Sequence, residues 1–497
     1  IKSLKFLIIY ISLTFYIVLN LNVQANENSR WPLPDWETLD NSNQMETKEC
    51  RDFKKLAVNS DTFLTDGLVV IKDGLIHYEY YDSKHGPSTP HALWSISKTI
   101  TGILLGITER DGRISFDSEL TSFYSREKND ENYKKITVKN LFYMDAGYIW
   151  EEGIKDTREN PLVNMLYGSG HKDMAIYAIN RKLSKEGPTY KWNYSTGLPT
   201  ITMGILKKIY GIEDDSMPWR SLFNPLGMNS AVFERDVSGT FVGGSSAFNT
   251  PRDLAKIGYL FLNNGIWNGE ILLPSDWIQK MLTPSPGYLS PGTIIKDITK
   301  VGVYGGSIWL NKETKKGKGR PYPNVPEDMY MALGFMGQLL IILPSQKMII
   351  VRTGHDSEYH SKTNEFISRA IQCFHDPNHK IGKSRPGNNP LEMSIGKLIR
   401  NVKNAIQANT LQGSIAKTIC SCHYVTGLDI PACIKRNNFT LAKLLTKITV
   451  TETKEFTGEM SINVKLSKFA RLFKHHRGDP VKAYYDPMRA EFGCTLK

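Results

Sequence analysis

Trp94-Ser95-Ile96-Ser97-Lys98 opens a stretch, residues 95–110, that is dense in isoleucine and leucine. The apolar residues fall on nearly every side of the predicted helix, so we expect it to be buried. Residues three apart on a helix share one face, which brings the hydroxyl of Ser95 within reach of the amine of Lys98. A buried ammonium without a partner costs several kcal/mol unless it gives up its proton. We therefore expect Lys98 to be a neutral base beside a hydroxyl.

The Ser-x-x-Lys spacing alone is weak evidence, because it recurs at Ser394 and Lys397 and at Ser414 and Lys417. A helix is predicted around Ser394 and Lys397, and its apolar stripe leaves both of these side chains on the solvent-exposed face. We expect Ser414 and Lys417 to be solvated too. Taken by itself, the tetrapeptide favours a helix that starts near the surface with Ser95 as its N-cap. The surroundings must decide between the two interpretations.

Strand-like runs occur on both sides of this helix along the chain. Residues 68–71 and 75–81 flank Lys72-Asp73-Gly74, which is a strong hairpin signal. Further strands are predicted at residues 306–310, 337–343 and 348–351, and helices at 138–144, 198–210, 251–261 and 357–374. We expect an α+β fold in which both ends of one segment build a single antiparallel sheet around an inserted helical region.

These features resemble the serine β-lactamase and penicillin-binding-protein fold, most of all the class C β-lactamase branch with its carboxylesterases and 6-aminohexanoate-dimer hydrolases. Trp94 to Lys98 is similar to the Ser-x-x-Lys element of that fold, and Tyr194-Ser195-Thr196 to its Tyr-x-Asn or Tyr-x-Ser motif. Ala332-Leu333-Gly334 stands where Lys-Thr-Gly is usual, so the cation that β-lactamases use for the substrate carboxylate is missing. The resemblance covers about residues 60–375.

The resemblance implies a serine hydrolase that cleaves a small ester or amide through an acyl-enzyme. Ser95 would be the nucleophile, and Lys98 and Tyr194 would share the movement of its proton. The backbone N–H groups of Ser95 and Phe335 would stabilise the oxyanion. The alternatives are a β-lactamase or D,D-peptidase, or a catalytically inactive envelope-binding protein.

The resemblance also places Trp150, Thr196 and Gly334 against the substrate. For Tyr194 the alternative is a packed aromatic residue with a bonded hydroxyl, and for Trp150 a plain core residue. No cofactor is implied, and we expect no metal site.

The first 25 residues are typical of a signal peptide: Lys2 and Lys5 precede an apolar run, and Val23-Gln24-Ala25 supplies a small-x-small cleavage pattern. We expect an exported protein, periplasmic or secreted. Its hydrolase domain would span residues 26–375, followed by a linker at 376–390 and a small α+β domain at 391–497.

Export would place the six cysteines in an oxidising compartment, which favours disulfides over a metal site at Cys420-Ser421-Cys422-His423 or at His375 and His379. The predicted domain at 391–497 resembles segments found in some exported members of the hydrolase branch. We expect Cys494 to pair with Cys420, with a Cys422 to Cys433 bond as the second choice.

The net charge of +12 is concentrated in the last quarter of the chain. Residues 376–497 contain 20 lysines and arginines against 9 acidic residues, a net charge of +11. This excess suits either an anionic envelope surface or a solvated surface that aids solubility. Export and the lack of a recognised nucleic-acid module argue against a nucleic-acid partner.

Overall fold

The fold is that of a computed structural model, which describes residues 30–58, 60, 63–126, 130–152, 160–211, 214–293, 301–313, 319–356, 362–383, 410–437, 449–455, 458–465 and 481–497. The predicted signal peptide, residues 384–390 of the predicted linker and the predicted helix at 391–406 lie outside these residues. Among the helices described, none combines the length and the apolar character that a membrane crossing requires.

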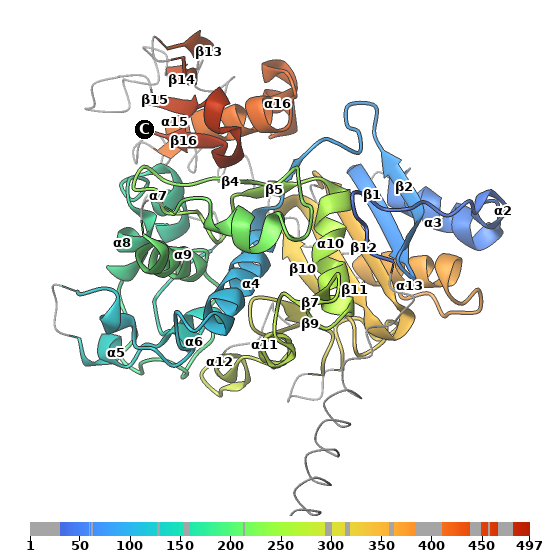
Figure 1. The fold of residues 1–497 in the computed structure, drawn as a ribbon, viewed down its shortest axis with the longest axis horizontal. Helices are drawn as coiled ribbons and strands as arrows, with labels where there is room; N and C mark the ends of the chain where they lie inside the picture. Colours follow the sequence, from blue (N-terminus) through green and yellow to red (C-terminus); the bar gives the residue numbers. More distant parts are fainter. Residues whose placement is uncertain are drawn as a thin grey trace, which may run out of the picture.

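A seven-stranded antiparallel sheet forms the centre of the main segment, which we define as the described residues from 30 to 383 (Figure 1). The strand order is β2 (Leu75–Tyr81), β1 (Thr65–Lys72), β12 (Met348–Gly354), β11 (Gln338–Leu343), β10 (Tyr330–Gly334), β9 (Trp309–Leu310) and β8 (Val303–Tyr304). Strands β1 and β12 are paired, with Val69 opposite Val351. The two ends of the segment therefore meet in one sheet, as the sequence predicts.

The predicted hairpin joins β1 to β2. Asp73 and Gly74 at its turn both have positive φ, 50° and 80°. The tight hairpin turns that match the twist of the strands need this conformation, and glycine adopts it without a Cβ penalty.

Side chains alternate between the two faces of the sheet along each strand. Both faces are buried. Val69 and Ile71 belong to the larger core, beneath α10 (Pro251–Leu262). Leu68 and Val70 belong to a second core, beneath α3 (Lys48–Val58) and α13 (Thr363–Phe374), which pack against each other (Figure 1).

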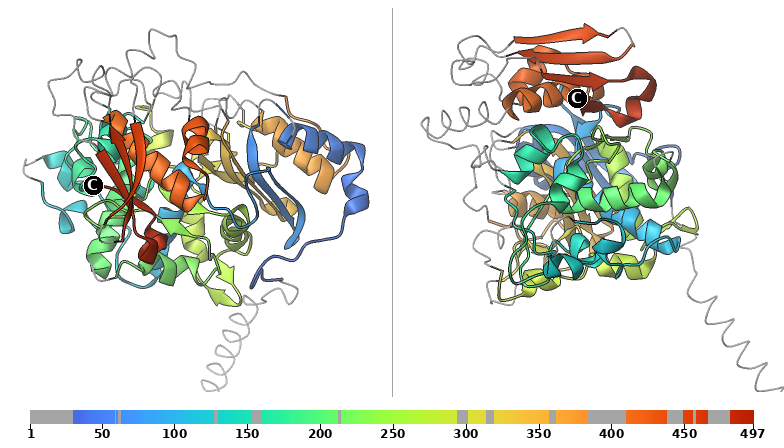
Figure 2. Two further views of the ribbon diagram at one scale, coloured as in Figure 1. Left: turned by 90° about the horizontal axis from the view of Figure 1, so that it is seen from above. Right: turned by 90° about the vertical axis from the view of Figure 1, so that its left-hand side faces the viewer.

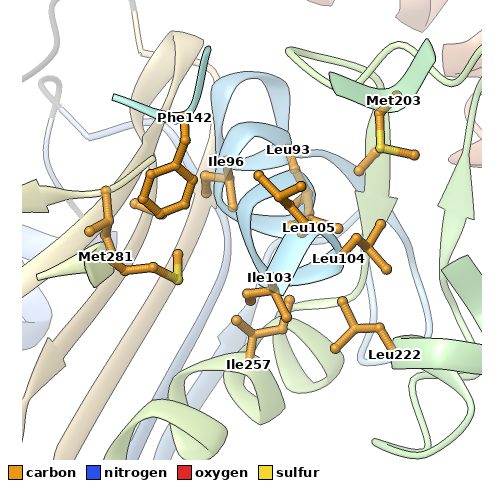
Figure 3. Close-up of a cluster of buried hydrophobic side chains, with 14 of the residues drawn as sticks. Leu93, Ile96, Ile103, Leu104, Leu105, Phe142, Met203, Leu222, Ile257 and Met281 are labelled. Atoms are coloured by element: carbon orange, nitrogen blue, oxygen red, sulfur yellow. The ribbon is translucent and has the colours of Figure 1, made fainter. Parts of the chain in front are cut away.

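The central helix α4 (Ser97–Arg110) is buried from Ser97 to Thr108, as its apolar sequence predicts. A short 3₁₀ turn, η1 (Trp94–Ile96), leads into it. Leu104 and Leu105 lie among side chains of several other elements, including Met203 and Leu222 (Figure 3). Gly106 is required by close packing, because a Cβ there would lie 2.4 Å from the Trp277 ring.

Helices inserted between the strands cover α4 on the side away from the sheet (Figure 1). α9 (Gly197–Tyr210) contacts both α4 and α6 (Val138–Phe142), and α6 begins with a capping box between Thr137 and Asn140. The other helices of the main segment are α2 (Ser42–Met45), α5 (Glu131–Lys134), α7 (Pro161–Tyr167), α8 (Met174–Ile179), α11 (Ser275–Met281) and α12 (Pro286–Leu289). Its short strands are β3 (His91–Ala92), β4 (Val232–Phe233), β5 (Ala247–Asn249), β6 (Ile266–Trp267) and β7 (Glu270–Ile271).

The tail, which we define as the described residues from 410 to 497, has a sheet and an apolar core of its own. It contains α15 (Thr410–Cys420), α16 (Ile430–Arg436), β13 (Thr449–Lys454), β14 (Met460–Lys465), β15 (Val481–Tyr485) and β16 (Cys494–Leu496). The four strands form an antiparallel sheet in that order, with α15 packed on it. Figure 2 shows the tail seated on one end of the main segment, where α15 contacts α7.

Three disulfides use all six cysteines: Cys50–Cys373, Cys420–Cys494 and Cys422–Cys433. The two disulfides of the tail are the pairings inferred from the resemblance. The first disulfide joins α3 to α13 and was not predicted. No cysteine thiol is left for a metal at Cys420 or Cys422.

The expectation that Lys417 is solvated is wrong. Its side chain is only 11% exposed and forms an ion pair with Glu234 of the main segment. Burial lowers the pKa of Lys417, and the Glu234 carboxylate opposes that shift. Ser414 donates a hydrogen bond to the carbonyl of Leu411 instead. The pair at Ser394 and Lys397 lies outside the described residues.

Candidate active site

Ser95 lies in the 3₁₀ turn that precedes α4, and a neighbouring strand fixes this turn on both sides. The backbone N–H of Leu93 donates to the carbonyl of Ala247 in β5. The N–H of Ala247 donates to the hydroxyl of Ser97, 3.0 Å away. Trp94 has a φ of 49°, a left-handed conformation that is strained in residues other than glycine. This turn directs the partly exposed Ser95 away from the core.

The amine of Lys98 lies in the centre of the predicted site. Its Nζ is 2.9 Å from Oγ of Ser95, 3.0 Å from Oγ1 of Thr196 and 2.8 Å from the carbonyl oxygen of Gly244. Lys98 is 1% exposed. Burial lowers its pKa to about 8, although the nearby Glu152 carboxylate opposes the shift. A substantial fraction of Lys98 is therefore neutral at slightly alkaline pH.

Glu152 connects Lys98 to a network that sequence reasoning missed. Its carboxylate lies 3.5 Å from the Lys98 amine. It accepts hydrogen bonds from the backbone N–H of Thr196, at 2.8 Å, and from the Thr196 hydroxyl. The indole N–H of Trp150 donates to the same carboxylate at 2.7 Å. The adjacent acids Glu151 and Glu152 were visible in the sequence, but a loop has no periodicity to show which one points inward.

Tyr194 lies over the Lys98 amine, with Nζ 4.6 Å from the centre of the ring. The ring packs against three other aromatic residues, Trp192, Tyr304 and Trp309, at centroid distances of 5.6 to 5.9 Å. The predicted partners Ser95, Lys98 and Tyr194 are thus brought together from η1, α4 and the loop before α9. Tyr194 is both a packed aromatic and a neighbour of the base.

The end of β10 forms the other wall of the site. Gly334 lies so close to the turn that holds Ser95 that a Cβ there would be 2.3 Å from the carbonyl oxygen of Leu93. The glycine is therefore required by backbone packing, whereas the sequence predicted a contact with substrate. Phe335 follows, and its ring packs edge-on against Trp94 at 5.6 Å. Met336, the next residue, has a φ of 62°, so a left-handed residue adjoins each predicted oxyanion donor.

Two other predicted substrate contacts are oriented differently from the expectation. Trp150 is 7% exposed and packs closely on Gly197, so it is a core residue that holds Glu152. Thr196 is 2% exposed and its hydroxyl lies between Lys98 and Glu152. Both side chains therefore help to position Lys98 through Glu152. Their contact with a substrate stays a prediction.

The position of the missing cation is occupied by an apolar side chain. Ala332 is buried in β10, opposite Leu340 of β11. Position 332 of β10 thus holds an alanine, where the related motif has a lysine. This agrees with the sequence comparison of Ala332-Leu333-Gly334 with Lys-Thr-Gly.

The tail borders the site on the far side of Trp94. A cavity of about 80 Å³ lies between the main segment and the tail. Trp94, Ser246 and Met336 line it from one side, and Lys417 and Asn437 from the other.

A buried lysine amine beside a serine hydroxyl, at the start of a buried helix next to an antiparallel sheet, is the arrangement of serine hydrolases with a beta-lactamase fold. The chain belongs to the beta-lactamase family, whose model matches residues 53–366. The resemblance inferred from sequence and the fold class are thereby confirmed.

The relatives that the chain resembles include hydrolases. The chain is 21% identical to the 6-aminohexanoate-dimer hydrolase of Paenarthrobacter ureafaciens over 276 residues, 50% of this chain and 70% of that protein. A solved structure from Bacillus anthracis, provisionally assigned as a 6-aminohexanoate-dimer hydrolase, is 21% identical, with a TM-score of 0.52 over 71% of this chain and 89% of that one. EstCE1, a hydrolase with promiscuous acyltransferase activity, has a TM-score of 0.51 at 11% identity, covering 67% of this chain and 98% of its own. These two structures share the fold.

Proposed function

We propose that the protein is an exported hydrolase that cleaves a small ester or amide through an acyl-enzyme on Ser95. The observation that carries the proposal is the distance of 2.9 Å between Nζ of Lys98 and Oγ of Ser95. The burial that lowers the pKa of Lys98 to about 8 supports its role as base.

The first step uses the three acceptors around Lys98. A neutral amine has two hydrogens, which it donates to the carbonyl of Gly244 and the hydroxyl of Thr196. Its lone pair is then free for the proton of Ser95. As Oγ of Ser95 bonds to the substrate carbonyl carbon, that proton moves to Nζ. The backbone N–H groups of Ser95 and Phe335 stabilise the oxyanion.

The second step releases the leaving group. The bond from the carbonyl carbon to the ester oxygen or amide nitrogen breaks, and the leaving atom takes the proton from Lys98 with help from Tyr194. Water then attacks the acyl group on Ser95, passes a proton to Lys98, and the acid product departs. Ser95 recovers its proton and the site is restored.

The substrate class follows from β10. An alanine at position 332 gives no charge partner for the carboxylate of a β-lactam or of a D-alanyl peptide. The relative from Paenarthrobacter ureafaciens is named for hydrolysis of an aminohexanoate dimer. Esters and short amides therefore come before β-lactams and D,D-peptides as candidate substrates.

Export is supported by the cysteines as well as by the predicted signal peptide. All six are paired, and such disulfides persist in oxidising compartments. Recovery of the protein from a periplasmic or culture-medium fraction, with the disulfides intact, is the expected result.

Labelling with a fluorophosphonate probe, mapped by mass spectrometry, tests the nucleophile. We expect one adduct on Ser95, which is lost in Ser95→Ala and in Lys98→Ala. Ser414→Ala is the matched control, because Ser414 also lies three residues before a buried lysine, and it should label like the wild type. Esters, short amides and β-lactams are then assayed in that order.

An unlabelled but correctly folded wild type would contradict the proposal. It would favour the alternative of an inactive protein that binds anionic envelope polymers through its basic tail. Binding to anionic vesicles that weakens as salt is raised would support that alternative.

A further inference from the structure

Four ionisable side chains of the main segment gather at the seam with the tail, apart from the Ser95 and Lys98 network. Asp66 comes from β1, His91 from β3, His85 from the loop between β2 and β3, and His355 directly follows β12. The ligand atoms of Asp66, His85 and His91 all lie within 4.8 Å of one another. Nδ1 of His355 is 2.9 Å from the Asp66 carboxylate.

His91 is the most unusual member of this cluster. It is 2% exposed, and neither of its ring nitrogens has a hydrogen-bond partner. Its ring centre lies 4.8 Å from that of His85. A buried polar group normally has a partner, because leaving it unpaired costs free energy. A neutral imidazole without a hydrogen-bond partner offers the lone pair of one ring nitrogen.

His85 is held in the orientation of a metal ligand. Its Nδ1 lies 2.5 Å from the carboxylate of Asp82, and its side chain is 2% exposed. A histidine that gives one ring N–H to a carboxylate presents the lone pair of the other nitrogen, as metal-binding histidines do. That other nitrogen, Nε2, faces Nη1 of Arg436 at 3.1 Å.

Arg436 in α16 is the cation now placed at the cluster. Its guanidinium also donates to the buried carboxylate of Asp66. The hydrogen bond from His355 and the charge of Arg436 hold the pKa of Asp66 well below its usual range, against the effect of burial. Asp66 and Asp82 together carry two negative charges, which Arg436 neutralises only in part.

We propose that Asp66, His85 and His91 bind a zinc-like divalent cation, which takes the place of the Arg436 guanidinium, with His355 as a candidate fourth ligand. One carboxylate with two or three imidazoles is a donor set that suits zinc. Zinc bound at about 2.0–2.2 Å needs its ligand atoms roughly 3.3 Å apart, so the present spacing of up to 4.8 Å has to contract when the ion binds. A charge of +2 matches the two carboxylates.

The proposed ligands are far apart in the sequence, so no short motif indicates a metal site. The cavity between the main segment and the tail is lined by all three histidines, Trp94 and Arg436. It provides the space into which the Arg436 guanidinium moves when the cation binds. Binding of the cation therefore competes with a contact that holds the tail to β1.

The test uses the full-length protein, stripped of metal with a chelator and titrated with Zn²⁺ against a chromophoric competitor. We expect one ion per chain. His91→Ala and His85→Ala should each weaken binding at least about tenfold. Arg436→Gln should tighten binding, because the competing charge is removed. The absorption spectrum of bound Co²⁺ should show tetrahedral coordination.

His375→Ala is the matched control, since this exposed histidine follows α13, belongs neither to the cluster nor to the lining of the cavity, and should leave binding unchanged. Thermal unfolding of each variant checks that it folds. If neither the wild type nor Arg436→Gln binds one Zn²⁺, the proposal fails. It also fails if the histidine variants, correctly folded, bind as tightly as the wild type, or if Arg436→Gln weakens binding. These readouts do not depend on hydrolysis, so they are independent of the proposed function.

Discussion

The protonation of Lys98 is set by two opposing influences at the scale of single residues. Burial favours the neutral amine, and the carboxylate of Glu152, 3.5 Å away, favours the charged one. Glu152 also holds Thr196, whose hydroxyl is one of the acceptors for Lys98. In the proposed mechanism, Glu152 is therefore a positioning residue that also changes the pKa of Lys98.

Glu152→Gln should move the pH dependence of hydrolysis. Activity needs neutral Lys98, so kcat/KM of the wild type should fall as pH drops below about 8. The glutamine lacks the charge that raises the pKa of Lys98, so the acid limb should move to lower pH by at least about one unit. Glu151→Gln, which changes the exposed neighbour, should leave the profile in place. An unchanged acid limb in Glu152→Gln would argue against Lys98 as the base.

Residue-level reasoning recovered part of this site. Ser95 and Lys98 drew attention because a lysine in an apolar helix needs an explanation, and the resemblance of the surroundings to the β-lactamase fold then decided against a surface helix start. The role of Glu152 depends on a loop that meets α9 in space, which no local pattern shows. The need for Gly334 likewise comes from Leu93, which is distant in sequence. Long-range contacts therefore account for what the residues alone could not predict.

At the scale of elements, several strands meet at the ion pair of Arg352 and Asp356, at the end of β12. Both side chains are fully buried, and their two hydrogen bonds are 2.7 and 2.6 Å long. The same guanidinium donates to Thr65 of β1 and to the carbonyl of Gly337, just before β11. One side chain thus joins three parts of the sheet beside the site.

Arg352→Met should lower the free energy of unfolding by about 3–5 kcal/mol, because it leaves the Asp356 carboxylate buried without its partner. Urea unfolding followed by tryptophan fluorescence measures the change. Arg220→Met removes an arginine from an exposed pair with Asp214 and should cost less than about 1 kcal/mol. Equal losses in the two variants would show that burial of the Arg352 pair does not matter for stability.

The elements predicted best were those with strong local signals. The hairpin at Asp73-Gly74, the all-apolar α4 and the Thr-Pro start of α10 all lie where the sequence predicts them. In the tail, the sequence shows strand-like alternation at 447–457, 460–475 and 481–496, and the four strands lie within these ranges, whereas α15 was not foreseen. The buried residues of α15 include Ile415 and Ile419, and α15 also packs on α7 of the main segment. The hydrophobic periodicity of the tail cannot predict this contact with α7.

At the scale of the whole molecule, the basic tail is attached to the main segment through buried or half-buried ion pairs. Lys417 meets Glu234, Arg436 meets Asp66, and Arg489 meets Asp215 at 2.8 Å. Part of the positive charge that suggested an external anionic partner is therefore used within the chain. Binding of the tail to an envelope surface stays a prediction.

Glu234→Gln should loosen this attachment. The Glu234 carboxylate is 3% exposed and, besides Lys417, accepts hydrogen bonds from Ser421 and from the backbone N–H of Cys494. Without its charge, Lys417 is left buried and unpaired. Hydrogen exchange at the amide of Cys494 should become at least about tenfold faster.

Glu452→Gln is the control, because the described partners of Glu452, His423 and Tyr424, both belong to the tail and its side chain is more exposed. It should leave the Cys494 amide protected. Equal protection of this amide in Glu234→Gln and the wild type would mean that the tail's own packing, rather than Glu234, keeps it closed.

The pairing of β1 with β12 bears on how the polypeptide is made. A strand near the beginning of the chain finds its partner only after residue 354 has emerged from the ribosome, and Cys50 has to wait for Cys373. Until then the apolar hairpin of β1 and β2 has an open edge, which is a hazard for aggregation. The hairpin therefore needs protection while the residues between β2 and β12 are synthesised, by a chaperone or by a delay in folding. The tail, whose disulfides span 74 and 11 residues, can close soon after its own last residue appears.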